Sequence, residues 1–214
     1  MEAKFRFNKT FRYEVNEPIE TVETVLYVLH GYGQQAKYFI RKFQKIEGSV
    51  LVVAPEGMHR FYLQGTSGRV GASWMTKEAR EDDISDNIEW LNALDDHITE
   101  KYAPKRKLIL GFSQGGATAA RWNYTEALRF EAMILWACVF PPDLDQDQEI
   151  VPQGQLHFAI GSEDEFYQGA DQNELLQFYQ EKDFETYLFE GKHDIHMETL
   201  EIILNRIKHL SNKR

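Results

Sequence analysis

Short runs of apolar residues alternate along the chain with segments of helical spacing. Nearly continuous apolar runs are typical of strands that are buried on both faces of a parallel sheet. Such runs lie at residues 24–29, 50–53, 107–110, 133–136 and 156–160, and residues 185–190 give a last strand. Apolar residues three or four positions apart predict helices within residues 36–43, 84–98 and 200–210. Asp171 and Glu174 resemble a capping box, which predicts a helix from there to about residue 182. This alternation over the whole chain predicts an α/β fold with three layers and a mostly parallel central sheet.

The start of the chain follows a different pattern. Residues 4–15 alternate apolar and polar positions, with Asn8 and Lys9 between the two halves. A period of two residues is typical of a strand that buries one face. We therefore expect an antiparallel hairpin at the N-terminus.

Composition and charge limit the class of protein. The 214 residues include 24 Lys and Arg against 34 Asp and Glu, a net charge of −10. This balance argues against nucleic-acid binding and favours a small neutral or cationic ligand. The longest apolar run, residues 132–140, has nine residues, whereas a membrane-spanning helix needs roughly 20. We expect one domain over residues 1–214, no transmembrane segment and a cytoplasmic location, while the oligomeric state stays open. Cys138, the single cysteine, lies in this run and is expected to be buried.

A strand–turn–helix motif surrounds Ser113. Residues 111–115 read Gly-Phe-Ser-Gln-Gly and match G-x-S-x-G, in which a sharp turn presents the serine hydroxyl above the sheet. The context fits, because an apolar run precedes the motif and the small residues 116–120 follow it. The helix N-terminus also favours developing negative charge. Ser113 is therefore a candidate nucleophile.

A nucleophilic serine needs a base, and the base needs an acid that orients it. In this kind of site the expected chain order is Ser, then Asp or Glu, then His. Glu163, Asp164 and Glu165 follow one buried run, and His193 follows the last predicted strand. Because open α/β sheets bind ligands at the carboxyl ends of their strands, these side chains are placed to meet Ser113.

His196 competes with His193 for the role of the base. Together with Asp194 the two histidines form a His-Asp-x-His cluster, which also resembles part of a metal site. No second pair of clustered ligands accompanies it, and the serine motif already accounts for one histidine. We therefore expect neither a metal nor another cofactor, and we expect His196 to brace the final helix.

Two glycines flank Tyr32 after the strand predicted at residues 24–29. Acyl transfer requires hydrogen-bond donors for an oxyanion, usually the amide after the nucleophile and one from a loop after an early strand. The backbone amides of Gln114 and Tyr32 hold these positions. Gly31 and Gly33 permit the tight backbone that directs the second amide into the site.

Four segments together resemble the α/β-hydrolase superfamily. They are Leu-His-Gly-Tyr-Gly at 29–33, Gly-Phe-Ser-Gln-Gly-Gly at 111–116, Gly-Ser-Glu-Asp at 161–164 and Glu-Gly-Lys-His at 190–193. More narrowly, the chain resembles the phospholipase/carboxylesterase branch, which includes the acyl-protein thioesterases. The resemblance implies an α/β-hydrolase sandwich without a large lid domain. It also implies Ser113 as nucleophile, His193 as general base and Asp164 as its orienting acid, with Tyr32 and Gln114 as oxyanion donors.

Residues 58–80 carry no clear period, although they contain several aromatic residues. A loop of this length in a compact domain is usually functional or disordered, and its aromatic residues argue against disorder. We expect this segment to form a wall of the substrate pocket, with Trp74 as principal contact, Phe61 and Tyr62 beside it, and His59 as a further candidate. In the alternative interpretation, the segment is a surface excursion packed by its own aromatic residues.

These features predict a serine hydrolase that cleaves small or medium acyl esters or thioesters through an acyl-enzyme intermediate. The alternative is a non-hydrolytic protein that binds a small molecule on the same fold, since a fold does not fix a function. A third possibility is a metal-dependent hydrolase that uses His193 and His196.

Overall fold

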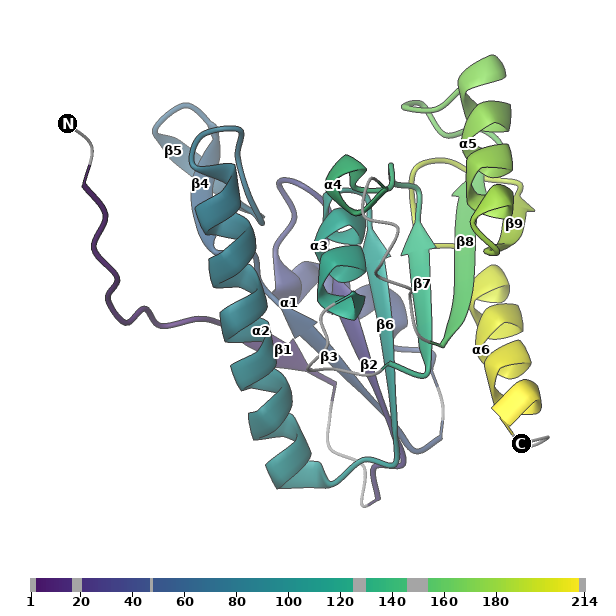
Figure 1. Ribbon diagram of the computed structural model, residues 1–214, viewed down its shortest axis with the longest axis horizontal. Helices are drawn as coiled ribbons and strands as arrows, with labels where there is room; N and C mark the ends of the chain where they lie inside the picture. Colours follow the sequence, from purple (N-terminus) through teal and green to yellow (C-terminus); the bar gives the residue numbers. More distant parts are fainter. Residues whose placement is uncertain (1–2, 17–20, 47, 125–129, 146–153, 212–214) are drawn as a thin grey trace.

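A mostly parallel sheet forms the centre of the molecule (Figure 1). The computed structural model describes residues 3–16, 21–46, 48–124, 130–145 and 154–211. Within these ranges the sheet has seven strands in the order β1-β3-β2-β6-β7-β8-β9. The strands are β1 (Tyr13–Val15), β2 (Thr24–Leu29), β3 (Val50–Pro55), β6 (Arg106–Phe112), β7 (Ala132–Trp136), β8 (Gln155–Gly161) and β9 (Glu185–Phe189). The five apolar runs and the last strand expected at residues 185–190 are therefore confirmed as strands.

Helices cover both faces of this sheet and form the outer layers (Figure 1). One face carries α2 (Arg80–Tyr102), α3 (Gln114–Asn123) and α5 (Ala170–Glu181). The other carries α1 (Ala36–Phe39), the 3₁₀ helix η1 (Ile40–Phe43) and α6 (Met197–Ser211), and a short α4 (Pro142–Asp145) follows β7. The predicted three-layer α/β fold is confirmed. Among the helices of the described ranges, none has the length and apolar character that spanning a bilayer requires.

The register of the parallel strands brings their carboxyl ends to one edge. Leu29 of β2 lies opposite Gly111 of β6, and Gly161 of β8 lies opposite Phe189 of β9. The segments that follow these strands therefore start from neighbouring positions, although they are far apart in the sequence. This edge collects all the residues singled out for chemistry.

The expected N-terminal hairpin is wrong. Only β1 forms within residues 4–15, and its antiparallel partner is β3. Phe5 and Phe7 are 89% and 86% exposed, so the alternation does not mark a buried face. Lys4 and Arg6 instead form ion pairs with carboxylates of α2, which hold this segment beside the helix.

The expectation of an irregular loop at residues 58–80 is also wrong. This segment forms the strands β4 (His59–Gln64) and β5 (Ser67–Ser73), which pair with each other as an antiparallel hairpin outside the main sheet. Figure 1 shows this hairpin beyond the N-terminal end of α2. Most of its residues are at least partly exposed, so no buried face imposes a hydrophobic period on the sequence.

A buried polar contact joins the sheet to α2. The Tyr27 hydroxyl donates to Oδ1 of Asp95 at 2.7 Å, and Nζ of Lys107 lies 2.5 Å from Oδ2 of the same carboxylate. Burial and the adjacent carboxylate raise the pKa of Tyr27 well above its usual value. Lys107 therefore supplies the positive charge that a carboxylate in this position requires.

We expect Lys107→Met to lower the free energy of unfolding by roughly 3 kcal/mol, because it leaves the buried Asp95 carboxylate without its cation. Lys105→Met is the matched control, since Lys105 pairs with Glu23 in an exposed ion pair and should change stability by less than about 1 kcal/mol. Urea denaturation of both variants measures the difference. Equal stability of the two variants would contradict the role assigned to Lys107.

Candidate active site

Ser113 occupies the sharp turn between β6 and α3. Its backbone has φ 51° and ψ −122°, a conformation that costs a non-glycine residue on the order of 1–3 kcal/mol. The turn is held by a hydrogen bond from the amide of Ser113 to the carbonyl of Trp136 at 2.9 Å. A Cβ on Gly115 would lie 2.4 Å from the carbonyl oxygen of Leu29, so the turn presses directly against the end of β2. The strand–turn–helix context predicted around Ser113 is confirmed.

His193 and Asp164 meet across the ends of β8 and β9. Nδ1 of His193 donates to Oδ2 of Asp164 at 2.7 Å, and the carboxylate is fully buried. Oδ1 of Asp164 accepts the backbone amide of Phe166 at 2.9 Å, which fixes the carboxylate. Glu165 instead accepts the backbone amide of His193, at 3.3 Å. Of the three candidate acids in the described chain, Asp164 alone is bonded to the imidazole.

Two aromatic rings hold the imidazole beside the serine turn. The ring centroid of His193 lies 4.8 Å from that of Phe112, the residue before Ser113, and 4.6 Å from that of Phe166. No hydrogen bond joins the Ser113 hydroxyl to His193 within the described residues. Hydrogen bonds of this kind are often long in unliganded sites and shorten when substrate binds. Phe166, which is 68% exposed, borders this candidate site, and no sequence pattern singled it out.

Two backbone amides near Ser113 are free to bind a ligand. The amides of Tyr32 and Gln114 donate no hydrogen bond to any described residue. Gln114 begins α3, and the first amides of a helix have no partner within it. A Cβ on Gly31 would lie 3.2 Å from Cβ of Ser113, so the loop that carries Tyr32 touches the serine turn. Both predicted oxyanion donors therefore border the same small region.

The candidate ligands of the alternative metal site bind different partners. Oδ1 of Asp194 lies 2.5 Å from Nζ of Lys42, whereas Nδ1 of His196 bonds to Oγ1 of Thr199 at 2.9 Å. Among the residues that the structure describes, no three His, Cys, Asp or Glu side chains form a group suited to a metal ion. His196 precedes α6 and braces its first turn, as expected.

A family model described as Serine hydrolase (FSH1) matches residues 21–200. The chain belongs to this family of serine hydrolases. No curated protein matches the sequence.

Solved structures show the same architecture. The structure of esterase PE8 aligns with a TM-score of 0.69 at 16% identity, over 94% of this chain and 99% of its own. Acyl-protein thioesterase 2 of Zea mays gives 0.66 at 16% identity, over 94% and 98%. The carboxylesterase of Bacillus cereus gives 0.66 at 16% identity, over 94% and 95%. These likenesses confirm the predicted α/β-hydrolase fold.

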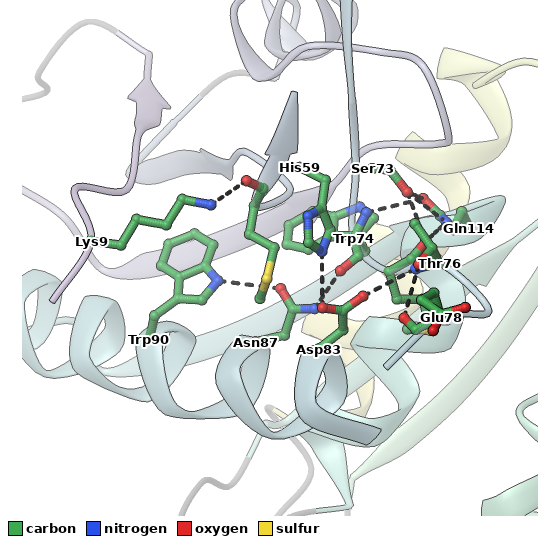
Figure 2. Close-up of polar contacts among 12 residues, drawn as sticks. Lys9, His59, Ser73, Trp74, Thr76, Glu78, Asp83, Asn87, Trp90 and Gln114 are labelled. Carbon is green, nitrogen blue, oxygen red and sulfur yellow. Dashed lines mark hydrogen bonds and ion pairs between the residues drawn. The ribbon is translucent and has the colours of Figure 1, made fainter. Parts of the chain in front are cut away.

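In this serine hydrolase, the side chain of Gln114 fastens the β4–β5 hairpin to the serine turn (Figure 2). Its Nε2 donates to the carbonyl of Met75 at 3.0 Å, and its Oε1 accepts the amide of Trp74 at 3.1 Å. A second attachment joins the base of the hairpin to α2, where Asp83 accepts the amide of Thr76 at 3.1 Å. The hairpin is therefore fixed to both helices that adjoin the site.

Trp74 belongs to the core, and its expected role as the main substrate contact is wrong. The side chain is fully buried, and its Nε1 donates to the carbonyl of His30 at 2.7 Å. Its ring stacks on that of Trp90, with centroids 6.5 Å apart. Phe61 and Tyr62 lie nearer the surface: Phe61 packs on Tyr32 at 5.1 Å, and Tyr62 is 49% exposed. The alternative interpretation, a surface excursion packed by its own aromatic residues, does not describe Trp74 either, because its ring packs on Trp90 and His30 of the core.

Two further histidines near the site have structural contacts. His30 accepts the amide of Gly57 on Nε2 at 2.9 Å, so its Nδ1 carries the proton and bonds to the carbonyl of Gly31 at 2.8 Å. Burial lowers the pKa of His30 to about 4, which keeps the ring neutral. His59, the candidate for the pocket lining, places Nε2 2.9 Å from Oδ1 of Asp83 on α2 (Figure 2).

We expect Trp74→Ala to lower the free energy of unfolding by about 3–5 kcal/mol, because it removes a buried indole and its hydrogen bond. Tyr62→Ala is the control on the same hairpin and should change stability by less than about 1 kcal/mol. Thermal melting of both variants measures the effect. An unchanged melting temperature for Trp74→Ala would show that the indole does not support the core.

Proposed function

We propose that this serine hydrolase cleaves carboxylic esters or thioesters with small or medium acyl groups through an acyl-enzyme intermediate. Ser113 is the nucleophile, His193 the general base and Asp164 the acid that orients it. The backbone amides of Tyr32 and Gln114 stabilise the oxyanion. The observation that carries the proposal is the 2.7 Å bond between His193 and a fully buried Asp164, beside a serine turn with φ 51°.

The bond to Asp164 decides which nitrogen of His193 acts as the base. Because Nδ1 donates to the carboxylate, Nε2 is left without a proton and is available to accept one. A buried carboxylate keeps this tautomer and stabilises the imidazolium that forms after proton transfer. The rings of Phe112 and Phe166 limit the rotation of the imidazole.

Two steps follow from this arrangement. In the first, Oγ of Ser113 attacks the carbonyl carbon while Nε2 of His193 takes the hydroxyl proton, and the carbonyl oxygen becomes an oxyanion at the two amides. His193 then gives its proton to the leaving alcohol or thiol as the bond to the acyl carbon breaks. In the second step, His193 takes a proton from water, the resulting hydroxide attacks the acyl carbon, and Ser113 leaves with its proton restored.

Exposed aromatic side chains suit an acyl group of limited length. Tyr32 and Phe166 are 62% and 68% exposed; Tyr32 carries one of the two free amides, and Phe166 packs on the imidazole of His193. Phe61 packs on Tyr32 and extends this apolar surface, and Tyr62 follows it along β4. We propose Phe61, Tyr62 and Phe166 as substrate contacts.

The alternative function, binding of a small molecule without hydrolysis, predicts no covalent intermediate. A fluorophosphonate probe tests this directly, because it reacts with an activated serine. We expect the probe to label the wild type and not Ser113→Ala, and we expect that substitution to lower kcat on p-nitrophenyl butyrate by about 10⁴ or more. Equal labelling of the two proteins would refute the assignment of Ser113.

The two neighbouring histidines should respond differently to substitution. His193→Ala should lower kcat by about 10⁴ or more, because the general base is lost. His196→Ala should keep most of its turnover and lose thermal stability, because His196 contacts Thr199 and stacks on Phe189. Steady-state kinetics and melting curves on both variants separate the roles, and the opposite order of activities would assign the base to His196.

A further inference from the structure

Four basic side chains surround a cavity of about 420 Å³ between the N-terminal segment, α1 and the β4–β5 hairpin. They are Arg12, Lys37, Arg60 and Arg69, and Gln35 and Tyr38 complete the polar lining. The cations come from separate parts of the chain: the residue before β1, the first turn of α1, β4 and β5. Their convergence is therefore produced by the tertiary fold.

One of these four charges is neutralised within the protein. Nε of Arg60 lies 2.6 Å from Oε1 of Glu56, a carboxylate that is 6% exposed. The other oxygen of Glu56 accepts the amide of Ala36, at the start of α1, at 3.3 Å. Glu56 is therefore fully engaged in holding Arg60 and the helix.

The other three charges have no acidic partner in the described part of the chain. Arg12 and Arg69 make no ion pair or hydrogen bond with their side chains there. The ammonium of Lys37 lies 4.8 Å from the centre of the Tyr38 ring, which provides no negative charge to balance it. Arg41 lies over the same ring at 5.1 Å and adds a further cation beside the cavity.

This excess of positive charge is opposite to the charge of the whole chain, which is −10. Like charges gathered around one cavity repel each other, and a bound anion removes that repulsion. Guanidinium groups also offer several donors in a planar fork, which matches the oxygens of a phosphate group. We propose that this cavity binds a small molecule that carries phosphate groups.

The place of the cavity shows which parts of the protein such a ligand would touch. Gln35 follows Tyr32 by three residues, and Arg60 immediately precedes Phe61, which packs on Tyr32. The ligand would therefore lie on the hairpin and loop that also border the serine turn. The proposal depends only on the charges and the cavity, so it stands whether or not the chain hydrolyses esters.

Inorganic pyrophosphate is the probe for this site, because it is compact and carries several negative charges. We expect isothermal titration calorimetry at low ionic strength to show saturable binding to the wild type. The double variant Arg12→Gln/Arg69→Gln should weaken binding by about tenfold or more, since it removes two charged side chains that form no ion pair or hydrogen bond with the described residues. Melting curves of the variant check that it remains folded.

A matched control removes two positive charges elsewhere. Lys45→Gln/Lys101→Gln changes exposed lysines on η1's C-terminal side and on α2, and it should leave pyrophosphate affinity within about twofold of the wild type. Equal weakening in both double variants would show that only net charge matters and would overturn the proposed site. Absence of saturable binding at millimolar pyrophosphate would also overturn it. Citrate serves as a carboxylate probe, and affinity for citrate equal to that for pyrophosphate would overturn the assignment to phosphate.

Discussion

The tight turn at Ser113 depends on glycines at the neighbouring positions 111 and 116. A Cβ on Gly111 would lie 2.6 Å from Cβ of Ala119, and one on Gly116 would lie 2.3 Å from Sγ of Cys138. Because these positions are empty, α3 packs directly on β6 and β7 and forces the serine into its positive φ. The buried Cys138 is part of this contact, and burial raises the pKa of its thiol to about 12, so it acts as an apolar residue. Close packing beneath the turn thus determines where the hydroxyl, the first helical amide and the imidazole can meet.

Gln114 connects the serine turn to the β4–β5 hairpin. Its backbone amide is free at the start of α3, while its side chain holds residues 73–75 at the end of the hairpin. The carbonyl of Trp74 in turn accepts Nδ2 of Asn87 on α2 at 2.7 Å. The side chain of Gln114 therefore fastens the end of the hairpin to the start of α3, while Asp83 and Asn87 fasten it to α2.

The sequence predicts those parts of the structure in which buried positions produce a continuous pattern of apolar residues. Strands such as β2 and β3 are buried at every position, which produces the short apolar runs typical of a sheet with two covered faces. The motifs around Ser113, Asp164 and His193 could be placed at one edge of the sheet because each follows a strand, and parallel strands end at the same edge. The β4–β5 hairpin has mostly exposed strands and thus no period to detect, and the alternation at residues 4–15 lacks a buried face. The burial of Trp74 depends on contacts with His30 and Asn87, which lie far from it in the sequence.

The exposed turn of the β4–β5 hairpin can accept insertions. The turn between the strands lies at Gly65 and Thr66, both exposed, whereas the attachments of the hairpin are at its base. Lengthening an exposed loop costs only about 0.6 kcal/mol for each doubling of its length. Insertions at this turn can therefore accumulate during evolution while the anchored base, the core and the serine turn stay as they are.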